Sequence, residues 1–327
     1  MKLINKIASL KSILKAKCFS YRIPLIVSWH LVNRCNRKCK YCYRWSTVEK
    51  ELSSDEVFCV IDVLSQMGNQ VIIFSGGEPL LRDDIGKIID YSQAKGIFTG
   101  LTSNGDLVPE RINEIKGLDM LKISFDGPKD VHDFLRGKGS YDNVMVAIET
   151  AKKYNIKVKF NTTLTKYNIE YIDFILEKAK QLNVKVKFQP VSHVHSAGKD
   201  IRDFFPEIKE YKQAVQRLID SKRTNKFIIN SIASLNYLST WPHPLKLKCY
   251  AGKLICCITA NGKVWPCSAA REESYHLNCL DPKFKKMFAR GLAMPFCQGC
   301  WCSSTLELNC LMKFNLNTIL NIRRLFD

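Results

Sequence analysis

The sequence lacks any long uninterrupted run of apolar residues. In the opening segment, MKLINKIASLKSILKAK, lysines recur every few residues, whereas the apolar part of a secretory signal peptide is unbroken. No segment approaches the ~18 consecutive apolar residues typical of a membrane-spanning helix. We therefore expect neither a signal peptide nor a transmembrane helix, and we expect a reducing, cytoplasmic compartment.

Acidic residues are also scarce. The sequence has 31 Asp and Glu against 50 Lys and Arg, a formal net charge of +19, and its first acidic residue is Glu49, after eleven Lys and Arg. Such a field favours an anionic substrate, RNA or anionic lipid headgroups, although a solvated basic surface explains it equally well. No recognisable nucleic-acid-binding module accompanies the charge.

Both ends of the sequence show a basic amphipathic pattern. In residues 1–23 and again in residues 311–327, apolar side chains recur at helical spacing among lysines or arginines. The pattern is typical of a helix lying on a membrane surface, and equally of a helix that closes one end of a barrel. Peripheral contact with an anionic membrane is therefore kept as an alternative.

From residue 24 to residue 200, strand and helix patterns alternate. Strand-like stretches such as PLIVSWHL, QVIIFSG and VKVKFQPV are each followed or preceded by helical spacing, and Ser53 or Ser54 is the expected cap of the first helix. Six strand–helix steps without an antiparallel interlude predict an α/β architecture with a parallel sheet. Functional groups of such folds gather in the loops after the strands.

Three cysteines, Cys35, Cys39 and Cys42, stand among five basic residues in NRCNRKCKYCYRW, directly after the first predicted strand. A disulfide would leave one thiol over, and a structural zinc site usually takes four ligands. An iron–sulfur cube held by three cysteines fits better, because one iron then remains open to a small molecule. We expect the neighbouring cations to favour the thiolate form.

The C-x3-C-x2-C spacing resembles the radical S-adenosylmethionine (SAM) superfamily, and SGGEP after the second predicted strand resembles its Gly-Gly-Glu-Pro motif. The resemblance implies a partial (β/α)6 TIM-like barrel over residues 24–200, with a 4Fe–4S cluster on Cys35, Cys39 and Cys42 that binds SAM. It further implies reductive cleavage of SAM to a 5′-deoxyadenosyl radical, which abstracts hydrogen from a substrate. A flavodoxin- or ferredoxin-like electron donor and sensitivity to oxygen go with that chemistry.

The same resemblance places a SAM pocket in the loops after the strands. Gly76 and Gly77 would allow a close backbone approach, Glu78 would receive the SAM ammonium group, and Arg136 would meet its carboxylate. TSNG, SFDG and VHDFLRG resemble further pocket segments, and an aromatic residue is usual between the last two cluster cysteines. The cofactor-binding candidates are Tyr41, Gly76, Gly77, Glu78, Ser103, Asn104, Ser124, Asp126 and Arg136.

A helical linker over residues 201–244 leads to a cysteine-rich segment, residues 245–310, that includes nine of the fourteen cysteines. Its hairpin, turning at Asn261 and Gly262, resembles the opening of SPASM and twitch extensions, which hold auxiliary 4Fe–4S clusters. Leu306 replaces a cysteine of the full pattern, which puts a second auxiliary cluster in doubt, and a zinc ribbon is the structural alternative. The resemblance implies one auxiliary cluster, on Cys249, Cys267, Cys297 and Cys300, with Cys302 or Cys310 as substitutes.

The resulting hypothesis is a radical SAM enzyme acting on a peptide or small metabolite, in which the auxiliary cluster aids oxidation or substrate binding. The alternatives are a lipid or membrane-associated substrate, an RNA-modifying radical enzyme, and a non-catalytic iron–sulfur or zinc-binding protein. His193 and His195, after the sixth predicted strand, are the candidates for acid–base catalysis because histidine titrates near neutral pH. As loop residues they are also explained by solvent exposure or a structural role.

Overall fold

The computed structural model describes residues 22–46, 49–192, 199–268, 277–292, 297 and 299–313. The predicted terminal helices over residues 1–23 and 311–327 lie outside these residues, apart from the short pieces 22–23 and 311–313. His193 and His195 also lie outside them. Within the described residues, no helix has the length and apolar character needed to cross a membrane.

Within the residues that the structure describes, eight strands form one sheet, in the order β6-β5-β4-β3-β2-β1-β7-β8. The first six pair in parallel with their neighbours along the chain, which confirms the predicted parallel α/β architecture. The strands are β1 (Ile26–Val32), β2 (Val71–Gly76), β3 (Phe98–Ser103), β4 (Met120–Ser124), β5 (Val158–Leu164), β6 (Lys185–Pro190), β7 (Ile255–Ile258) and β8 (Val264–Trp265).

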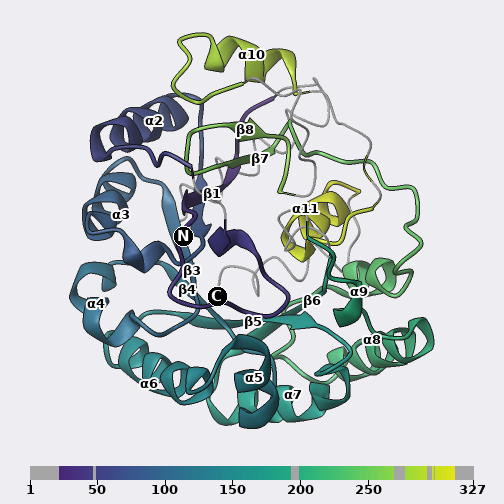
Figure 1. The fold of residues 1–327 in the computed structure, drawn as a ribbon. Coiled ribbons are helices and arrows are strands. Elements are labelled where there is room, and N and C mark those ends of the chain that lie inside the picture. The colour runs from purple at the N-terminus through teal and green to yellow at the C-terminus, as the bar shows by residue number, and fades with distance from the viewer. Residues whose placement is uncertain are drawn as a thin grey trace.

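Helices lie around the outside of this sheet (Figure 1). The last helix before each of β2 to β6 returns the chain to the start of that strand, as parallel pairing requires. The helices are α2 (Ser54–Gln66), α3 (Ile85–Ala94), α4 (Val108–Ile115), α5 (Lys129–Arg136), α6 (Ser140–Lys153), α7 (Ile172–Gln181), α8 (Ile208–Lys222), α9 (Ile232–Leu238), α10 (Phe284–Arg290) and α11 (Ser303–Met312).

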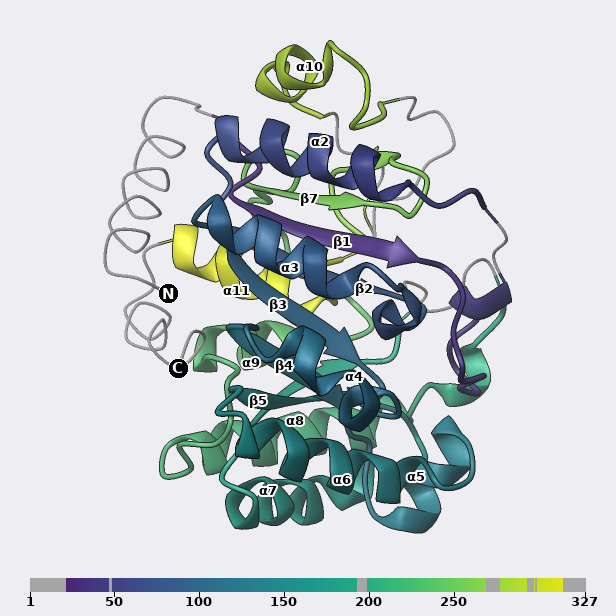
Figure 2. The same cartoon turned by 90° about the vertical axis from the view of Figure 1, so that its left-hand side faces the viewer.

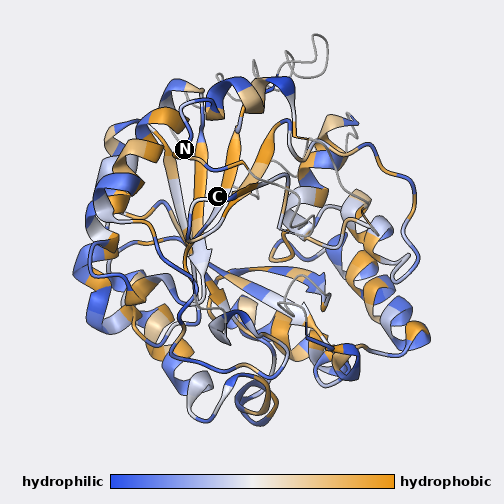
Figure 3. Cartoon of the chain, turned by 45° about the horizontal axis from the view of Figure 1, so that its top comes forward, coloured by the Kyte–Doolittle hydropathy of each residue, from blue (hydrophilic) through white to orange (hydrophobic). Residues whose placement is uncertain are grey.

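The first of these helices, α2, shows how the sequence sets its start. The Ser53 hydroxyl accepts a hydrogen bond from the Glu56 backbone N–H at 3.2 Å, and the Glu56 carboxylate accepts one from the Ser53 N–H at 2.8 Å. This reciprocal capping box confirms Ser53 as the cap. Figure 3 shows helices that combine blue and orange residues, as amphipathic helices do, whereas several strands are mainly orange and others are white or partly blue.

The cysteine-rich segment adds strands to the same sheet. β7 pairs in parallel with β1, with Ile255 opposite Ile26, and β8 pairs antiparallel with β7. Gly262 takes a φ of +82° in the turn between them, which confirms the predicted hairpin. α11 contacts α9 and β6, and Figure 1 shows it within the ring of elements. The cysteine-rich segment and the barrel therefore share one sheet.

We expect Leu306→Ala to lower the free energy of unfolding by about 2–5 kcal/mol, since Leu306 is fully buried in α11 against Tyr237 and Leu238. Urea unfolding under anoxic conditions measures the change. Leu245→Ala is the control, because Leu245 is 61% exposed and its loss should cost under about 0.5 kcal/mol. Equal effects of the two substitutions would show that α11 does not contribute to the core.

Candidate functional site

A cavity of about 250 Å³ lies where the carboxyl ends of the strands meet the following loops. Figure 2 shows the arrowheads of β1 and β3 pointing toward the edge of the molecule at which these loops gather. Alternate residues of β1, β2, β4, β5 and β6 face into it, together with Thr102 of β3. A last part of the wall comes from Trp301, Cys302 and Ser304, at the start of α11.

The loop after β1 presents Cys35, Cys39 and Cys42 to this cavity. Nitrogen donors face two of the three sulfurs: the Arg37 backbone N lies 3.4 Å from the Cys35 Sγ, and Arg136 Nη1 lies 4.0 Å from the Cys39 Sγ. Three thiols on one loop with N–H donors around them form a donor set that fits a cube with one open iron.

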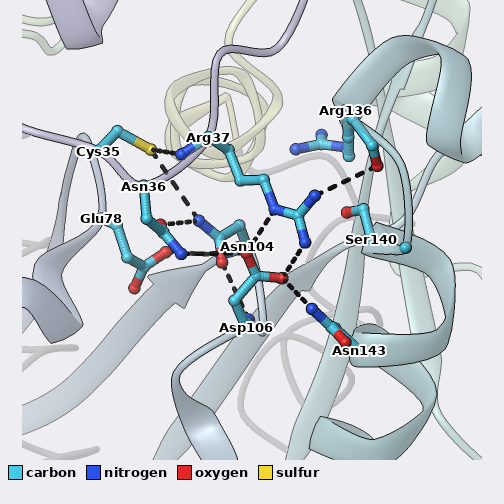
Figure 4. Close-up of polar contacts among 12 residues, drawn as sticks. Cys35, Asn36, Arg37, Glu78, Asn104, Asp106, Arg136, Ser140 and Asn143 are labelled. Carbon is cyan, nitrogen blue, oxygen red and sulfur yellow. Dashed lines mark hydrogen bonds and ion pairs between the residues drawn. The ribbon is translucent and has the colours of Figure 1, made fainter.

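An ion pair between Arg37 and Asp106 fixes this loop (Figure 4). Arg37 donates to both carboxylate oxygens of Asp106, and its Nη1 also donates to the Gly137 and Lys138 carbonyl oxygens. The Asn36 side chain donates to Asp106 as well, at 3.0 Å. The loop is thus bound to the segments after β3 and α5. The sequence analysis counts Arg37 only among the basic residues of the cysteine run, and Asp106 lies one residue beyond TSNG, so the ion pair between them was not anticipated.

Gly76 and Gly77 allow the cluster loop to approach β2. A Cβ on Gly77 would lie 2.1 Å from the Arg34 carbonyl oxygen, and one on Gly76 would lie 2.1 Å from the Val32 carbonyl oxygen. Real side chains do not reach such distances. The close approach expected at the two glycines is therefore made here by the chain's own backbone, while both residues also line the cavity.

Glu78 is completely buried and does not line the cavity. Its Oε2 accepts a hydrogen bond from the Asn104 N–H at 2.8 Å, and its Oε1 accepts one from the Leu80 N–H at 3.2 Å. Burial raises the pKa of this carboxyl to about 7, against the lowering effect of those backbone donors. In this arrangement Glu78 joins the loops after β2 and β3, and its expected contact with the SAM ammonium stays a prediction.

Arg136, Asp126 and Tyr41 form a buried network beside the thiols. Asp126 Oδ2 accepts from Arg136 Nε at 2.6 Å and from the Tyr41 hydroxyl at 2.7 Å, and Arg136 Nη2 donates to the Tyr41 oxygen at 2.5 Å. Asp126 Oδ1 accepts from the Thr163 N–H of β5. Asp126 itself is fully buried, so its role here is to position Arg136, which does reach the cavity.

His132 of α5 supports this network and was not anticipated from the sequence. Its Nδ1 accepts a hydrogen bond from the Asp126 backbone N–H at 3.1 Å, so the ring proton is on Nε2, which donates to the Ser140 hydroxyl at 3.1 Å. Burial lowers the pKa of His132 to about 4, with the charge of Arg136 acting in the same direction. The imidazole is therefore neutral at physiological pH.

Two basic residues of the cluster loop are engaged away from the thiols. Arg34 pairs with Glu51, and the Lys40 ammonium lies 3.8 Å from the centre of the Phe134 ring. Burial raises the pKa of Cys35 to about 12 and that of Cys39 to about 11. Arg136 and the loop's own Arg37 lower the pKa of Cys39, in the expected direction, but burial outweighs both charges.

Seven of the nine SAM-pocket candidates line the cavity, and Glu78 and Asp126 do not. His30 of β1, which the sequence analysis did not single out, also lines it, and its Nδ1 lies 3.1 Å from Arg44 Nη1. The seven candidates at the cavity are Tyr41, Gly76, Gly77, Ser103, Asn104, Ser124 and Arg136.

A second group of thiols lies beside α11. Asn309 of α11 places its Nδ2 3.7 Å from the sulfurs of both Cys249 and Cys300, and Cys267 packs with Cys249. Cys297 is exposed. These thiols and the shared amide donor fit the expected auxiliary cluster. In the described part of the chain, no three Cys, His, Asp or Glu side chains converge closely enough to hold one metal ion.

The two substitute cysteines lie elsewhere. Cys302 lines the main cavity. A negative charge on its sulfur would raise the pKa of Cys300 and the pKa values of Lys122 and Lys187. Cys310 is buried in an apolar cluster with Tyr237, Leu238 and Leu306.

Comparison with known proteins agrees with this geometry. The model of the Radical SAM superfamily matches residues 29–179, a range that includes all three cluster-loop cysteines and every SAM-pocket candidate. The chain contains a radical SAM domain. Crystallised Streptococcus suis SuiB bound to S-adenosylmethionine superposes with a TM-score of 0.68 at 16% identity, over 86% of this chain and 69% of SuiB. That likeness shows the same fold, including its extension beyond the radical SAM domain.

Curated relatives match this chain over shorter or longer parts of its length. AdoMet-dependent heme synthase of Nitratidesulfovibrio vulgaris is 27% identical over 74% of this chain and 73% of its own length. Fe-coproporphyrin III synthase of Methanosarcina barkeri is 34% identical over 46% of this chain. The latter alignment and those with two further heme synthases span only 39 to 45% of the relatives' length.

We expect Gly77→Ala to displace the cluster loop, because the new methyl group would meet the Arg34 carbonyl oxygen. Iron bound per chain after anoxic reconstitution should fall, and unfolding free energy should drop by about 1–3 kcal/mol from overpacking. Gly96→Ala is the matched control, because no atom lies within 4 Å of the Cβ that the substitution adds. It should lower the free energy of unfolding by only about 1 kcal/mol, the cost of a left-handed backbone conformation at alanine. Normal iron content in Gly77→Ala would contradict this account of the glycine pair.

His132 should make stability depend on pH. Its folded pKa of about 4 lies below the ordinary 6.5, so its contribution is complete above pH 6.5 and is lost as the pH falls toward 4. The loss should reach up to about 3 kcal/mol, measured by urea unfolding from pH 7 to 4.5. His132→Gln should flatten the profile, whereas substitution of the exposed His243 should leave it unchanged. If the wild type, His132→Gln and the His243 variant lost stability equally between pH 7 and pH 4.5, groups other than His132 would cause the acid sensitivity.

Proposed function

We propose that this protein uses its radical SAM domain as an enzyme, with Cys35, Cys39 and Cys42 as the ligands of its SAM-binding 4Fe–4S cluster. The observation that carries the proposal is the shared cavity: the three thiols line it together with seven of the nine residues expected to contact SAM. Bound there, the cluster and SAM supply the one-electron chemistry that removes a hydrogen atom from a substrate. A small electron-transfer protein would act as the reductant.

The chain's own residues prepare this site in three ways. The Arg37–Asp106 ion pair holds the cluster loop in place. Arg136, oriented by Asp126, keeps a fixed positive charge beside Cys39, where the SAM carboxylate would bind. Trp45 and Trp301 contribute to the cavity wall and would limit the entry of water.

We further propose one auxiliary 4Fe–4S cluster on Cys249, Cys267, Cys297 and Cys300. Support comes from Asn309, whose amide is directed at two of these sulfurs from a fully buried position. Hydrogen bonds to sulfur are among the features that set the reduction potential of a cluster. α11 bears this donor and also contributes Ser304 to the main cavity, which supports a role of the auxiliary cluster in oxidation of a substrate.

For the substrate, we favour a small metabolite over a peptide. The modest volume of the cavity, about 250 Å³, suits a compact molecule. The names of two relatives specify tetrapyrrole products, namely heme and Fe-coproporphyrin III. A peptide is the second candidate, because a structural neighbour, SuiB, was crystallised with its precursor peptide SuiA.

Electron paramagnetic resonance of the anoxically reconstituted, dithionite-reduced protein tests both clusters. We expect a signal that shifts on addition of SAM, together with formation of 5′-deoxyadenosine. A Cys35/Cys39/Cys42→Ala triple variant should lose the SAM-sensitive signal and keep a second one, from the auxiliary cluster. A Cys59→Ala variant, which changes an exposed cysteine outside both groups, is the control. Absence of any SAM-sensitive signal in the wild type would refute the proposed function.

A further inference from the structure

Lysines occupy the inward-facing positions of three neighbouring strands. Lys122 of β4 pairs in register with Lys159 of β5, and Asn161, one inward position further along β5, pairs with Lys187 of β6. Because strand side chains alternate between the two faces, these lysines share the inner face of the barrel. Lys122 and Lys187 line the same cavity as the three cluster-loop thiols.

The surroundings of Lys122 do not balance its charge. Within the described residues, the groups whose charges act on it are Lys187, Lys159 and the Cys302 thiol, with no carboxylate among them. Burial, followed by repulsion from Lys187 and Lys159, lowers its pKa well below the usual range. An anion placed beside Lys122 would therefore favour its protonated form and bind to it.

Lys187 is only 8% exposed, and its ammonium donates to the neutral Ser304 hydroxyl at 2.6 Å. Glu307 is the carboxylate whose charge acts on it, but no ion pair between the two is found in the described part of the chain. Glu307 Oε1 instead accepts hydrogen bonds from the Ser231 N–H and the Ser234 hydroxyl. Lys187 thus enters the cavity without an ion pair to a carboxylate in the described residues, although the charges of Cys302 and Glu307 act on it.

The amino end of α11 lies against the same lysine. Ser304, in the first turn of this ten-residue helix, accepts the Lys187 hydrogen bond and lines the cavity. No side chain caps this helix end, and its first turn has no acidic residue. The positive end of the helix dipole therefore adds to the field of the two lysines.

A second cavity, of about 400 Å³, extends this positive region to the amino ends of β5 and β6. Lys159 lines it and also acts on Lys122, so the lysines of the two cavities are electrostatically connected. Five lysines contribute to its wall: Lys152, Lys157, Lys159, Lys185 and Lys226. Lys152, Lys157 and Lys226 are exposed, so this cavity opens at the surface, whereas Lys159 is buried.

We propose that Lys122, Lys187 and the amino end of α11 form an oxyanion site, which holds a carboxylate or phosphate group of the substrate inside the cavity that the cluster-loop thiols line. The inference rests on the proposed function, because it takes this cavity as the place where the substrate reacts. An oxyanion between the two ammonium groups relieves their mutual repulsion and offsets the cost of burying them. Ser304, and Gln189 on the next inward position of β6, supply further polar contacts at the cavity wall.

Protection of the lysines from chemical labelling tests the site. The reconstituted protein is acetylated briefly with acetic anhydride under anoxic conditions, and mass spectrometry follows Lys122 and Lys187. Glutarate and inorganic phosphate are the charged probes, dimethyl glutarate is the neutral analogue, and chloride matches the ionic strength. We expect glutarate or phosphate to slow acetylation of both lysines about tenfold, as a charge-assisted contact predicts, and the more effective of the two identifies the oxyanion.

Two variants distinguish anion binding at this site from a general effect of ionic strength on lysine acetylation. Lys187→Gln should abolish the protection of Lys122, whereas Lys212→Gln, at an exposed position of α8, should preserve it. Protection by neither anion, or equal protection by dimethyl glutarate, would overturn the proposal. The measurement needs no turnover, and the SAM-dependent resonance signal recorded on the same sample reports the proposed function separately. A normal SAM response without lysine protection would reject the oxyanion site alone.

Discussion

The buried carboxylate of Asp126 is the interaction on which the geometry of the core site depends. Its Oδ2 accepts hydrogen bonds from Tyr41 of the cluster loop and Arg136 of α5, while its Oδ1 accepts one from the Thr163 N–H of β5. Its backbone N–H binds His132. A buried charge that loses one partner costs several kcal/mol, so the loop, the helix and the strand are held in one arrangement. The position of the three thiols relative to Arg136 follows from it.

The shared sheet has a similar consequence on a larger scale. Because β7 pairs with β1, the cysteine-rich segment is attached to the strand that leads into the cluster loop. α11 then contacts β6, at the opposite edge of the sheet. The two thiol groups are therefore related through regular secondary structure and not through a flexible linker. A fixed separation between them suits electron transfer, which is sensitive to distance.

Sequence patterns predicted the six strand–helix steps, the Ser53 cap and the hairpin at Gly262, because each depends on local spacing and turn chemistry. The direction of a loop side chain depends on its neighbours in space, so local spacing did not reveal that Glu78 accepts hydrogen bonds from the backbone of two loops. The lysines of β4–β6 were equally hard to interpret. Lysine alternating with apolar residues is typical of a strand with one solvated face, and here that face is turned inward.

The placement of α11 has a consequence for biosynthesis. The cluster loop ends near residue 42, whereas Trp301, Cys302 and Ser304 complete the wall of its cavity, some 260 residues later in the chain. At about 5–20 residues per second, the ribosome takes roughly 13–50 s to synthesise the intervening segment. Throughout that interval the three thiols lack the wall that later encloses them. The nascent chain therefore passes through a period in which iron–sulfur carriers, and also oxidants, have a wider approach to the site than they have in the finished fold.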